Sequence, residues 1–251
     1  MTPQKMLDEW HKQQTAFIEL RDLRTRFLVD IVEYHRQRLG RPLTIVDVGC
    51  GPGSLGTAIL ERIPDSRVYG LDRDPLLLRL GRETNKHGEN FTFLDVDITS
   101  EDLAEQLPVQ QIDVTVSATA LHWLMPQDLV QLYQAVGKLT VDGGLFMNAD
   151  HLDYDGRTQT FLDEYSQQYK TTHLKDSYAK GAMSWQTWWE EMKALPGWEK
   201  ERDEWEKRWE GKKTAPHVSE DFHFEALRAA GFGQTGTVYQ WLEDRLILAV
   251  K

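Results

Sequence analysis

The sequence predicts an α/β fold whose doubly wound, mostly parallel sheet of seven strands ends in an antiparallel hairpin. Short β-branched runs alternate with helical apolar patterns five times, and the connections are short, as in parallel sheets with helices on both faces. Only three residues separate the last two runs, which allows a hairpin but no crossover. Strands are expected at 44–48, 67–71, 91–96, 112–117, 145–149, 235–241 and 245–250.

Helical patterns fill most of the connections. The first covers residues 6–39 with apolar residues at three- and four-residue spacing, and it should stop at Gly40 and Pro42. Asp74 followed by Pro75 is typical of a helix N-cap with proline at the first helical position. Further helices are expected over 55–63, 76–82 and 128–139, from Ser100, within 152–216 and from Ser219 to 227, with a turn at 142–144.

The segments outside this alternation are expected to decorate a single domain over residues 1–251. Residues 1–40 should form a helical lid, and residues 152–216 a helical cap inserted before the hairpin. Six tryptophans fall in the cap, and three of them share one helical face: Trp185, Trp188 and Trp189. Such a face either packs the cap on the sheet or forms an aromatic wall for an apolar or cationic ligand.

Composition and charge exclude several classes of protein. A net charge of −11 argues against binding to a nucleic-acid backbone, which requires a basic surface. Cys50 is the only cysteine and no histidine pair has metal-ligand spacing, so we expect no metal. The N-terminus lacks the apolar run of a signal peptide, and no stretch approaches the roughly 18–20 apolar residues of a membrane span. We expect a cytoplasmic protein that binds a small molecule and neither nucleic acid nor membrane; the oligomeric state is not predicted.

A glycine-rich loop follows the first strand. Gly49, Gly51 and Gly53 stand where this strand turns into a helix, and side chains there would block a ligand lying across the strand ends. That crevice is the usual ligand site of an open parallel sheet. Asp72 ends the second strand about twenty residues later, where an acid can accept both hydroxyl hydrogens of a ribose.

Residues 47–53, Asp-Val-Gly-Cys-Gly-Pro-Gly, resemble motif I of the class I S-adenosylmethionine-dependent methyltransferases, which have a Rossmann-like sheet. The resemblance implies S-adenosylmethionine as the cofactor. It also implies that Asp47 orients the methionyl ammonium, that the three glycines line the methionyl and ribose portions, and that Asp72 holds the ribose. A tight strand–helix turn without a ligand is the structural alternative.

Two other functions are compatible with this loop. A nicotinamide-dependent oxidoreductase is one, because Gly51, Gly53 and Gly56 also fit Gly-x-Gly-x-x-Gly. Asp47 argues against it, since dinucleotide-binding folds usually carry an apolar residue there, and the terminal hairpin also resembles the methyltransferase sheet. A non-catalytic nucleotide-binding module is the other.

The third-strand segment resembles a later motif of the same family. There an acid after the strand accepts the adenine amino group, and the next residue supplies a backbone contact. Asp97 and Ile98 match best by spacing, while Asp95 is an alternative one step across the pleat.

The fourth-strand segment also resembles the family. Leu121-His122-Trp123 resembles the branch that contains trans-aconitate methyltransferases and the carboxyl methyltransferases of biotin synthesis. Ala118 replaces the asparagine found in many relatives, which leaves Ser117 or the backbone to contact the cofactor.

The resemblance covers about residues 43–150 and implies methyl transfer to a small-molecule acceptor, with a carboxylate or hydroxyl oxygen as the candidate nucleophile. His122 and His151 follow the fourth and fifth strands, so both are expected to face the crevice, where each could position or deprotonate the acceptor. Alternatively, His122 packs structurally and His151 is a solvated loop residue. The fold class does not identify the acceptor.

Overall fold

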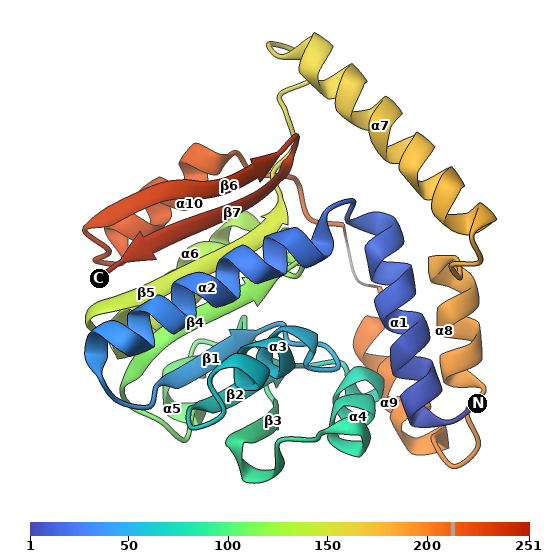
Figure 1. Ribbon diagram of the computed structural model, residues 1–251, viewed down its shortest axis with the longest axis horizontal. Coiled ribbons are helices and arrows are strands. Elements are labelled where there is room, and N and C mark those ends of the chain that lie inside the picture. The colour runs from blue at the N-terminus through green and yellow to red at the C-terminus, as the bar shows by residue number, and fades with distance from the viewer. Residues whose placement is uncertain (212–213) are drawn as a thin grey trace.

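The computed structural model describes residues 1–211 and 214–251. Its strands are β1 (Thr44–Val48), β2 (Arg67–Asp72), β3 (Phe91–Asp95), β4 (Ile112–Ala118), β5 (Thr140–His151), β6 (Gln234–Trp241) and β7 (Asp244–Val250). They form one sheet in the order β3-β2-β1-β4-β5-β7-β6 (Figure 1). The first five strands pair in parallel, whereas β7 runs antiparallel to both β5 and β6. This confirms the predicted sheet and its terminal hairpin.

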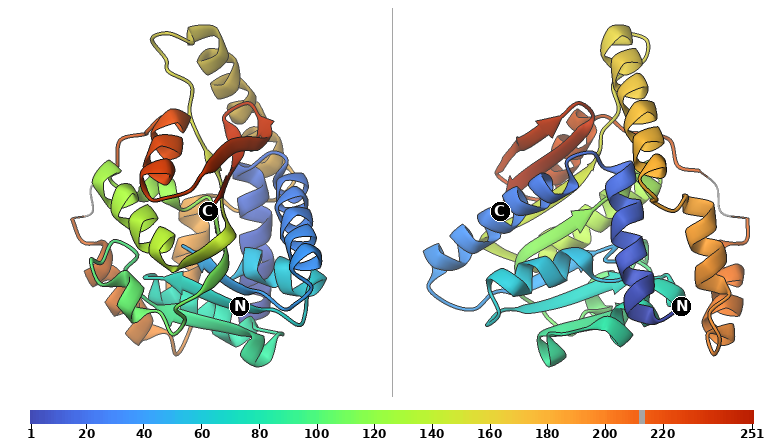
Figure 2. Two further views of the ribbon diagram at one scale, coloured as in Figure 1. Left: turned by 90° about the vertical axis from the view of Figure 1, so that its left-hand side faces the viewer. Right: turned by 45° about the vertical axis from the view of Figure 1, so that its right-hand side comes forward.

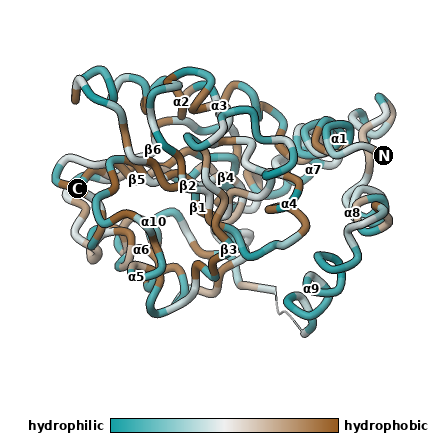
Figure 3. Tube along the Cα trace, turned by 90° about the horizontal axis from the view of Figure 1, so that it is seen from below, coloured by the Kyte–Doolittle hydropathy of each residue, from teal (hydrophilic) through white to brown (hydrophobic). Residues whose placement is uncertain are grey.

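Helices cover both faces of the sheet, as the β–α alternation predicts. They are α2 (Arg21–Leu39), α3 (Ser54–Arg62) and α4 (Pro75–Thr84) on one face, and α5 (Leu103–Gln106), α6 (Pro126–Leu139) and α10 (Glu220–Ala229) on the other. Each layer buries its own apolar core against the strands. The tube in Figure 3 is brown along the central strands, which are apolar because both faces are covered.

The N-terminal segment forms two helices, so the single helix predicted over residues 6–39 is wrong. α1 (Pro3–Phe17) ends where Ile18 takes an extended conformation and is only 1% exposed. α2 then starts at Arg21 and lies on the sheet, whereas α1 packs beside α4. The sequence has no glycine or proline at the break to signal it. The predicted stop at Gly40 is confirmed, with φ at 66°.

The turn predicted at residues 142–144 lies inside β5. The pairing with β4 shifts between Thr140 and Leu145, and the residues between them leave the regular ladder. Gly143 takes a φ of 74° there, which a glycine adopts without strain. The expected turn is therefore a local irregularity within a longer strand.

The helix predicted from Ser100 starts later than expected. α5 begins at Leu103 and has four residues. The Asp97 carboxylate accepts the Thr99 N–H at 3.0 Å, and the Ser100 hydroxyl bonds to Asp102. These local bonds hold the chain in a turn where helix was expected.

The described residues of the predicted cap form three helices: α7 (Thr160–Ala179), α8 (Trp185–Lys193) and α9 (Glu199–Trp209). An apolar cluster joins α1, α4 and α8 and includes Met6, Leu77 and Trp188. Figure 2 shows α1, α8 and α9 gathered on one side of the sheet, while α7 extends away from it. Residues 212–213 of the predicted cap lie outside the described residues.

Two absences concern the part of the chain that the structure describes. No helix there is both long enough and apolar enough to cross a membrane. No group of three or more His, Cys, Asp or Glu side chains there could hold a metal ion. The absence of a metal remains a prediction.

Candidate active site

A cleft of about 1820 Å³ opens at the carboxyl edge of the parallel strands. Residues at or just beyond the ends of β1 to β4 line it, together with residues of α1, α2, α8 and α9. Its volume exceeds the roughly 300–1,000 Å³ of ordinary ligand pockets, so a cofactor and a second small molecule fit together. Eight of the predicted site residues meet here: Asp47, Gly49, Gly51, Asp72, Asp97, Ile98, His122 and His151.

The three predicted glycines have different roles. Gly49 has a φ of 67°, and a Cβ there would lie 2.4 Å from the Cβ of Ala120, so this close approach requires glycine. Gly51, with a φ of 52°, lines the cleft. Gly53 precedes α3 at a φ of 83°, and a Cβ would lie 2.7 Å from the Phe93 ring. The structure therefore gives Gly53 a packing role and does not bring it to the cleft.

Asp47 brings a buried carboxylate to the cleft. Asp47 is only 1% exposed, and its Oδ2 accepts the Gly56 N–H at 3.0 Å. Burial raises the pKa of Asp47 to about 7; the hydrogen bond from Gly56 opposes this, and the nearby Asp72 carboxylate adds to it. Within residues 1–211 and 214–251, no cationic side chain forms an ion pair with Asp47. The ammonium group of a ligand would supply the missing charge.

Asp72 connects the glycine loop to the start of α4. Its Oδ2 accepts the Gly51 N–H at 2.7 Å, and its Oδ1 accepts the Asp74 N–H at 2.9 Å. Each carboxylate oxygen has two acceptor positions, so Asp72 can also accept hydroxyl hydrogens from a ligand. Asp74 caps α4 as predicted, and its Oδ2 accepts the Trp205 Nε1–H at 2.9 Å.

The two acids that follow β3 lie in different places. Asp97 and Ile98 line the cleft, and Asp97 also forms a 3.0 Å ion pair with Arg73. Asp95 does not line the cleft; Arg208 of α9 binds its carboxylate at 2.6 Å. The geometry favours Asp97 over Asp95 as the acid at a ligand site.

Ser117 lies beneath the cleft and does not line it. Its buried hydroxyl donates to the Val48 carbonyl at 2.8 Å and so links β4 to β1. Residues 118–120 line the cleft in its place. Among them Thr119 has a φ of 55°, and Arg24 donates to its hydroxyl at 2.9 Å. The predicted contact between Ser117 and a cofactor has no support in this arrangement.

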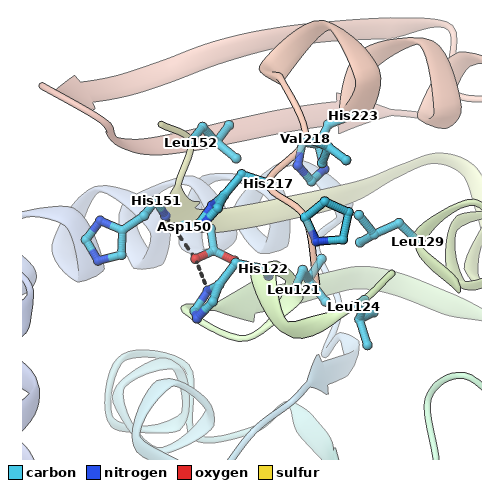
Figure 4. A pocket seen from close by; sticks show the side chains of 11 residues that line it. Leu121, His122, Leu124, Leu129, Asp150, His151, Leu152, His217, Val218 and His223 are labelled. Carbon is cyan, nitrogen blue, oxygen red and sulfur yellow. Dashed lines mark hydrogen bonds and ion pairs between the residues drawn. The ribbon is translucent and has the colours of Figure 1, made fainter. Parts of the chain in front are cut away.

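His122, which follows β4, forms a hydrogen-bonded pair with Asp150, which lies near the end of β5 (Figure 4). His122 Nδ1 lies 2.7 Å from Asp150 Oδ1, and the His122 backbone N–H donates to Oδ2 at 3.1 Å. Burial alone would raise the pKa of Asp150, but the charge and hydrogen bond of His122 lower it to about 2. The ionised carboxylate favours the imidazole tautomer that carries its proton on Nδ1 and its lone pair on Nε2. His122 is thus set up to accept a proton.

Asp150 is not among the site residues predicted from the sequence, although it directly precedes His151. An acid at the carboxyl end of a strand was the available signal. The pairing with His122 depends on the register of β4 against β5, in which Ala118 lies beside Ala149. Sequence spacing alone does not give that register.

His151 occupies the last position of β5 and lines the cleft, so it is not a solvated loop residue. Its side chain is 16% exposed. Burial lowers the pKa of His151 to about 3, although the Asp150 charge opposes this. A neutral imidazole of such low basicity suits hydrogen bonding better than proton removal, which favours His122 as the base.

The cap tryptophans divide between packing and lining. Trp188 is fully buried, and its Nε1–H donates to the Met6 carbonyl at 3.2 Å. Trp185 is 41% exposed and lines the cleft beside Trp10, with ring centroids 6.2 Å apart. Trp188 thus packs the cap against α1, and Trp185 brings an aromatic ring to the cleft. That this ring forms a wall for a ligand stays a prediction.

Several known proteins are similar in sequence to the part of the chain that contains this site. Residues 46–146 match a family model described as a methyltransferase domain. A trans-aconitate 2-methyltransferase of Rhodopseudomonas palustris is 30% identical over 146 residues, which cover 58% of this chain and 52% of that protein. A tRNA N(3)-methylcytidine methyltransferase of Schizosaccharomyces pombe is 29% identical over 122 residues, which cover 48% of this chain and 49% of that protein. The chain thus spans about half the length of these curated relatives.

The fold is shared with solved methyltransferases. The apo structure of the S-adenosylmethionine-dependent methyltransferase SibL matches 85% of this chain and 52% of its own, with a TM-score of 0.55 and 18% identity. The sheet order and the glycine loop define a Rossmann-like fold, in which the carboxyl edge of the sheet is the usual place for a ligand. Residues 46–146, which match the methyltransferase domain, are therefore similar to the S-adenosylmethionine-dependent methyltransferases in sequence, and the whole chain has their Rossmann-like fold.

Proposed function

We propose that the protein transfers the methyl group of S-adenosylmethionine to an oxygen atom of a small-molecule acceptor. The main support for this proposal is that Asp47 is a buried carboxylate in the cleft and forms no ion pair within the described chain. The methionyl ammonium would supply its counter-charge, Asp72 would bind the ribose hydroxyls, and Asp97 with Ile98 would contact the adenine. When bound, the cofactor supplies an electrophilic methyl group on a positively charged sulfur.

His122 would act as the general base for a hydroxyl acceptor. Its Nε2 would accept the hydroxyl proton while the oxygen attacks the methyl group, whose bond to sulfur would break as the neutral thioether leaves. Asp150 would stabilise the imidazolium that forms. A carboxylate acceptor is already ionised and needs no such base. The His122–Asp150 pair therefore supports a hydroxyl acceptor over a carboxylate one.

By their names, the curated relatives act on different acceptors, trans-aconitate and a tRNA. A small molecule is favoured here by two observations. The cleft of about 1820 Å³ has room for a cofactor and one more small ligand. The net charge of −11 disfavours a polyanion such as RNA.

The direct test incubates the protein with S-adenosylmethionine labelled in its methyl group and a panel of hydroxylated acids, phenols and alcohols. Label should appear in at least one hydroxyl compound, and His122→Gln should lower kcat by about 100-fold or more. Label in a tRNA or a carboxylate only would contradict the proposed acceptor. Oxidation of NADH or NADPH without methyl transfer would instead support the nicotinamide alternative.

A further inference from the structure

Two basic side chains of the N-terminal helices line the cleft near each other. His11 belongs to α1, and Arg21 is the first residue of α2. Each lies partly buried. Within residues 1–211 and 214–251, neither side chain forms a hydrogen bond or an ion pair. A guanidinium that is removed from water without a partner is costly, so this arrangement points to a ligand.

The electrostatics of the pair indicate an anion. Burial, followed by the nearby charge of Arg24, lowers the pKa of Arg21 to about 10, although the charge of Asp22 opposes this. Burial, followed by the charge of Arg21, lowers the pKa of His11 to about 4. Two acids, Asp8 and Asp22, act in the opposite direction on His11, but they do not outweigh these effects. A negative group bound at this point would relieve the unfavourable charge.

We propose that the acceptor carries a carboxylate that Arg21 binds, with His11 donating a further hydrogen bond. This inference rests on the proposed function and names the class of acceptor. The carboxylate is a binding group and not the methylated atom, because His122 and Asp150 supply a base that a carboxylate nucleophile does not need. The planar guanidinium matches a carboxylate with two parallel hydrogen bonds.

The position of Arg24 connects the two ends of the acceptor site. Its charge acts on Arg21 and also on His151, so Arg24 lies near both of these cleft residues. Asp244 already holds Arg24 in an ion pair, so of these two neighbouring guanidinium groups Arg21 is the one available for a ligand. A bound acid would reach from Arg21 toward the base across a single cleft.

The walls beside Arg21 indicate the rest of the acceptor. Trp185 contacts Trp10 and Phe17, with ring centroids 6.2 and 6.4 Å apart, and all three rings line the cleft. Arg21 contributes one positive charge here, whereas the His11 imidazole is neutral and two acids lie nearby. This charge balance suits a ligand group with a single negative charge better than a phosphate dianion. We therefore expect a hydroxylated acid with an apolar, preferably aromatic, body.

The test compares matched acids and amides on the protein saturated with S-adenosylhomocysteine. Dissociation constants are measured by calorimetry for 4-hydroxybenzoate, 4-hydroxycinnamate and 4-hydroxyphenylacetate and for the primary amide of each. At least one acid should bind about tenfold or more tightly than its amide. Arg21→Gln should abolish the preference, and Arg21→Lys should retain part of it.

Arg26→Gln is the matched control, because Arg26 lies on the same helix and lines the same cleft but is exposed. It should leave the preference intact, and all three variants should bind S-adenosylhomocysteine like the unmodified protein. Equal binding of acids and amides, no acid binding at millimolar concentration, or a preference that survives Arg21→Gln would overturn the proposal. Failure of S-adenosylhomocysteine to bind would instead count against the proposed function, and the acid–amide comparison would still be made on the ligand-free protein.

Discussion

Arg24 on α2 and Asp244 at the start of β7 form an ion pair whose side chains are only 2% and 1% exposed. Arg24 also donates a hydrogen bond to the hydroxyl of Thr119, which follows β4. Its contacts therefore connect α2 both to the terminal hairpin and to the end of β4. Because both charges are buried, removing one leaves the other uncompensated.

Arg24→Met should therefore lower the free energy of unfolding by about 3–5 kcal/mol. Urea denaturation monitored by circular dichroism measures this change. The double variant Arg24→Met, Asp244→Leu should recover much of the loss, because it removes both charges. If the free energy of unfolding of the single variant fell by less than about 1 kcal/mol, the ion pair would not be important for the stability of the fold.

Asp150→Asn should reduce kcat by about 100- to 10,000-fold, because the amide no longer favours the His122 tautomer with its proton on Nδ1. Nitrogen NMR of the imidazole reports the tautomer directly, and kcat follows from methyl transfer to the identified acceptor. Cofactor affinity should not change. Full activity in a folded Asp150→Asn variant would remove His122 as the base.

Asp47 should make the ligand-free protein less stable as the pH rises. Its folded pKa is raised to about 7 from an ordinary value of 3.8, so the folded state holds the proton more tightly than the unfolded state. The resulting stabilisation is fully present below about pH 4 and is lost as the pH rises through 7. Cofactor binding follows the opposite trend and should weaken below pH 7, where the carboxylate loses its charge.

The variant Asp47→Asn separates these effects. It should raise the free energy of unfolding at pH 8 by about 2–4 kcal/mol and lower the affinity for S-adenosylmethionine. The exposed Asp142→Asn is the control, since it makes the same chemical change outside the cleft. If Asp47→Asn destabilised the protein at pH 8 and left the affinity unchanged, both the raised pKa and the ammonium contact would be wrong.

Asp72→Ala should weaken S-adenosylhomocysteine binding by about 1–3 kcal/mol, because the ribose hydroxyls lose their acceptor. Asp72 also accepts two backbone N–H groups, so loop disorder is a competing explanation. A 2′,3′-dideoxy analogue distinguishes the two, since it lacks the hydroxyls. Equal losses for both ligands would assign the effect to the loop and contradict the ribose contact.

The sequence was most informative where chemistry is local. The strand before Gly49, the N-cap at Asp74 and the terminal hairpin are encoded by neighbouring residues, and the structure confirms them. The break at Ile18 was not predictable, because it arises from α1 packing on α4 instead of following α2 along the sheet.

The candidate site follows the same rule. Asp47, Asp72 and Asp97 lie at or near the carboxyl ends of strands that can be recognised one at a time, and they meet because parallel strands share an edge. The contacts of His122 with Asp150 and of Arg24 with Asp244 depend on register and on the return of the hairpin beside β5. Such long-range contacts leave no pattern in neighbouring residues.

Calorimetric titration of the purified protein with S-adenosylmethionine, S-adenosylhomocysteine, NADH and NADPH tests the central claim most directly. We expect micromolar binding of the two sulfur compounds, and no binding of either nicotinamide. Binding of a nicotinamide instead would contradict the account and would make Gly51, Gly53 and Gly56 the relevant glycines.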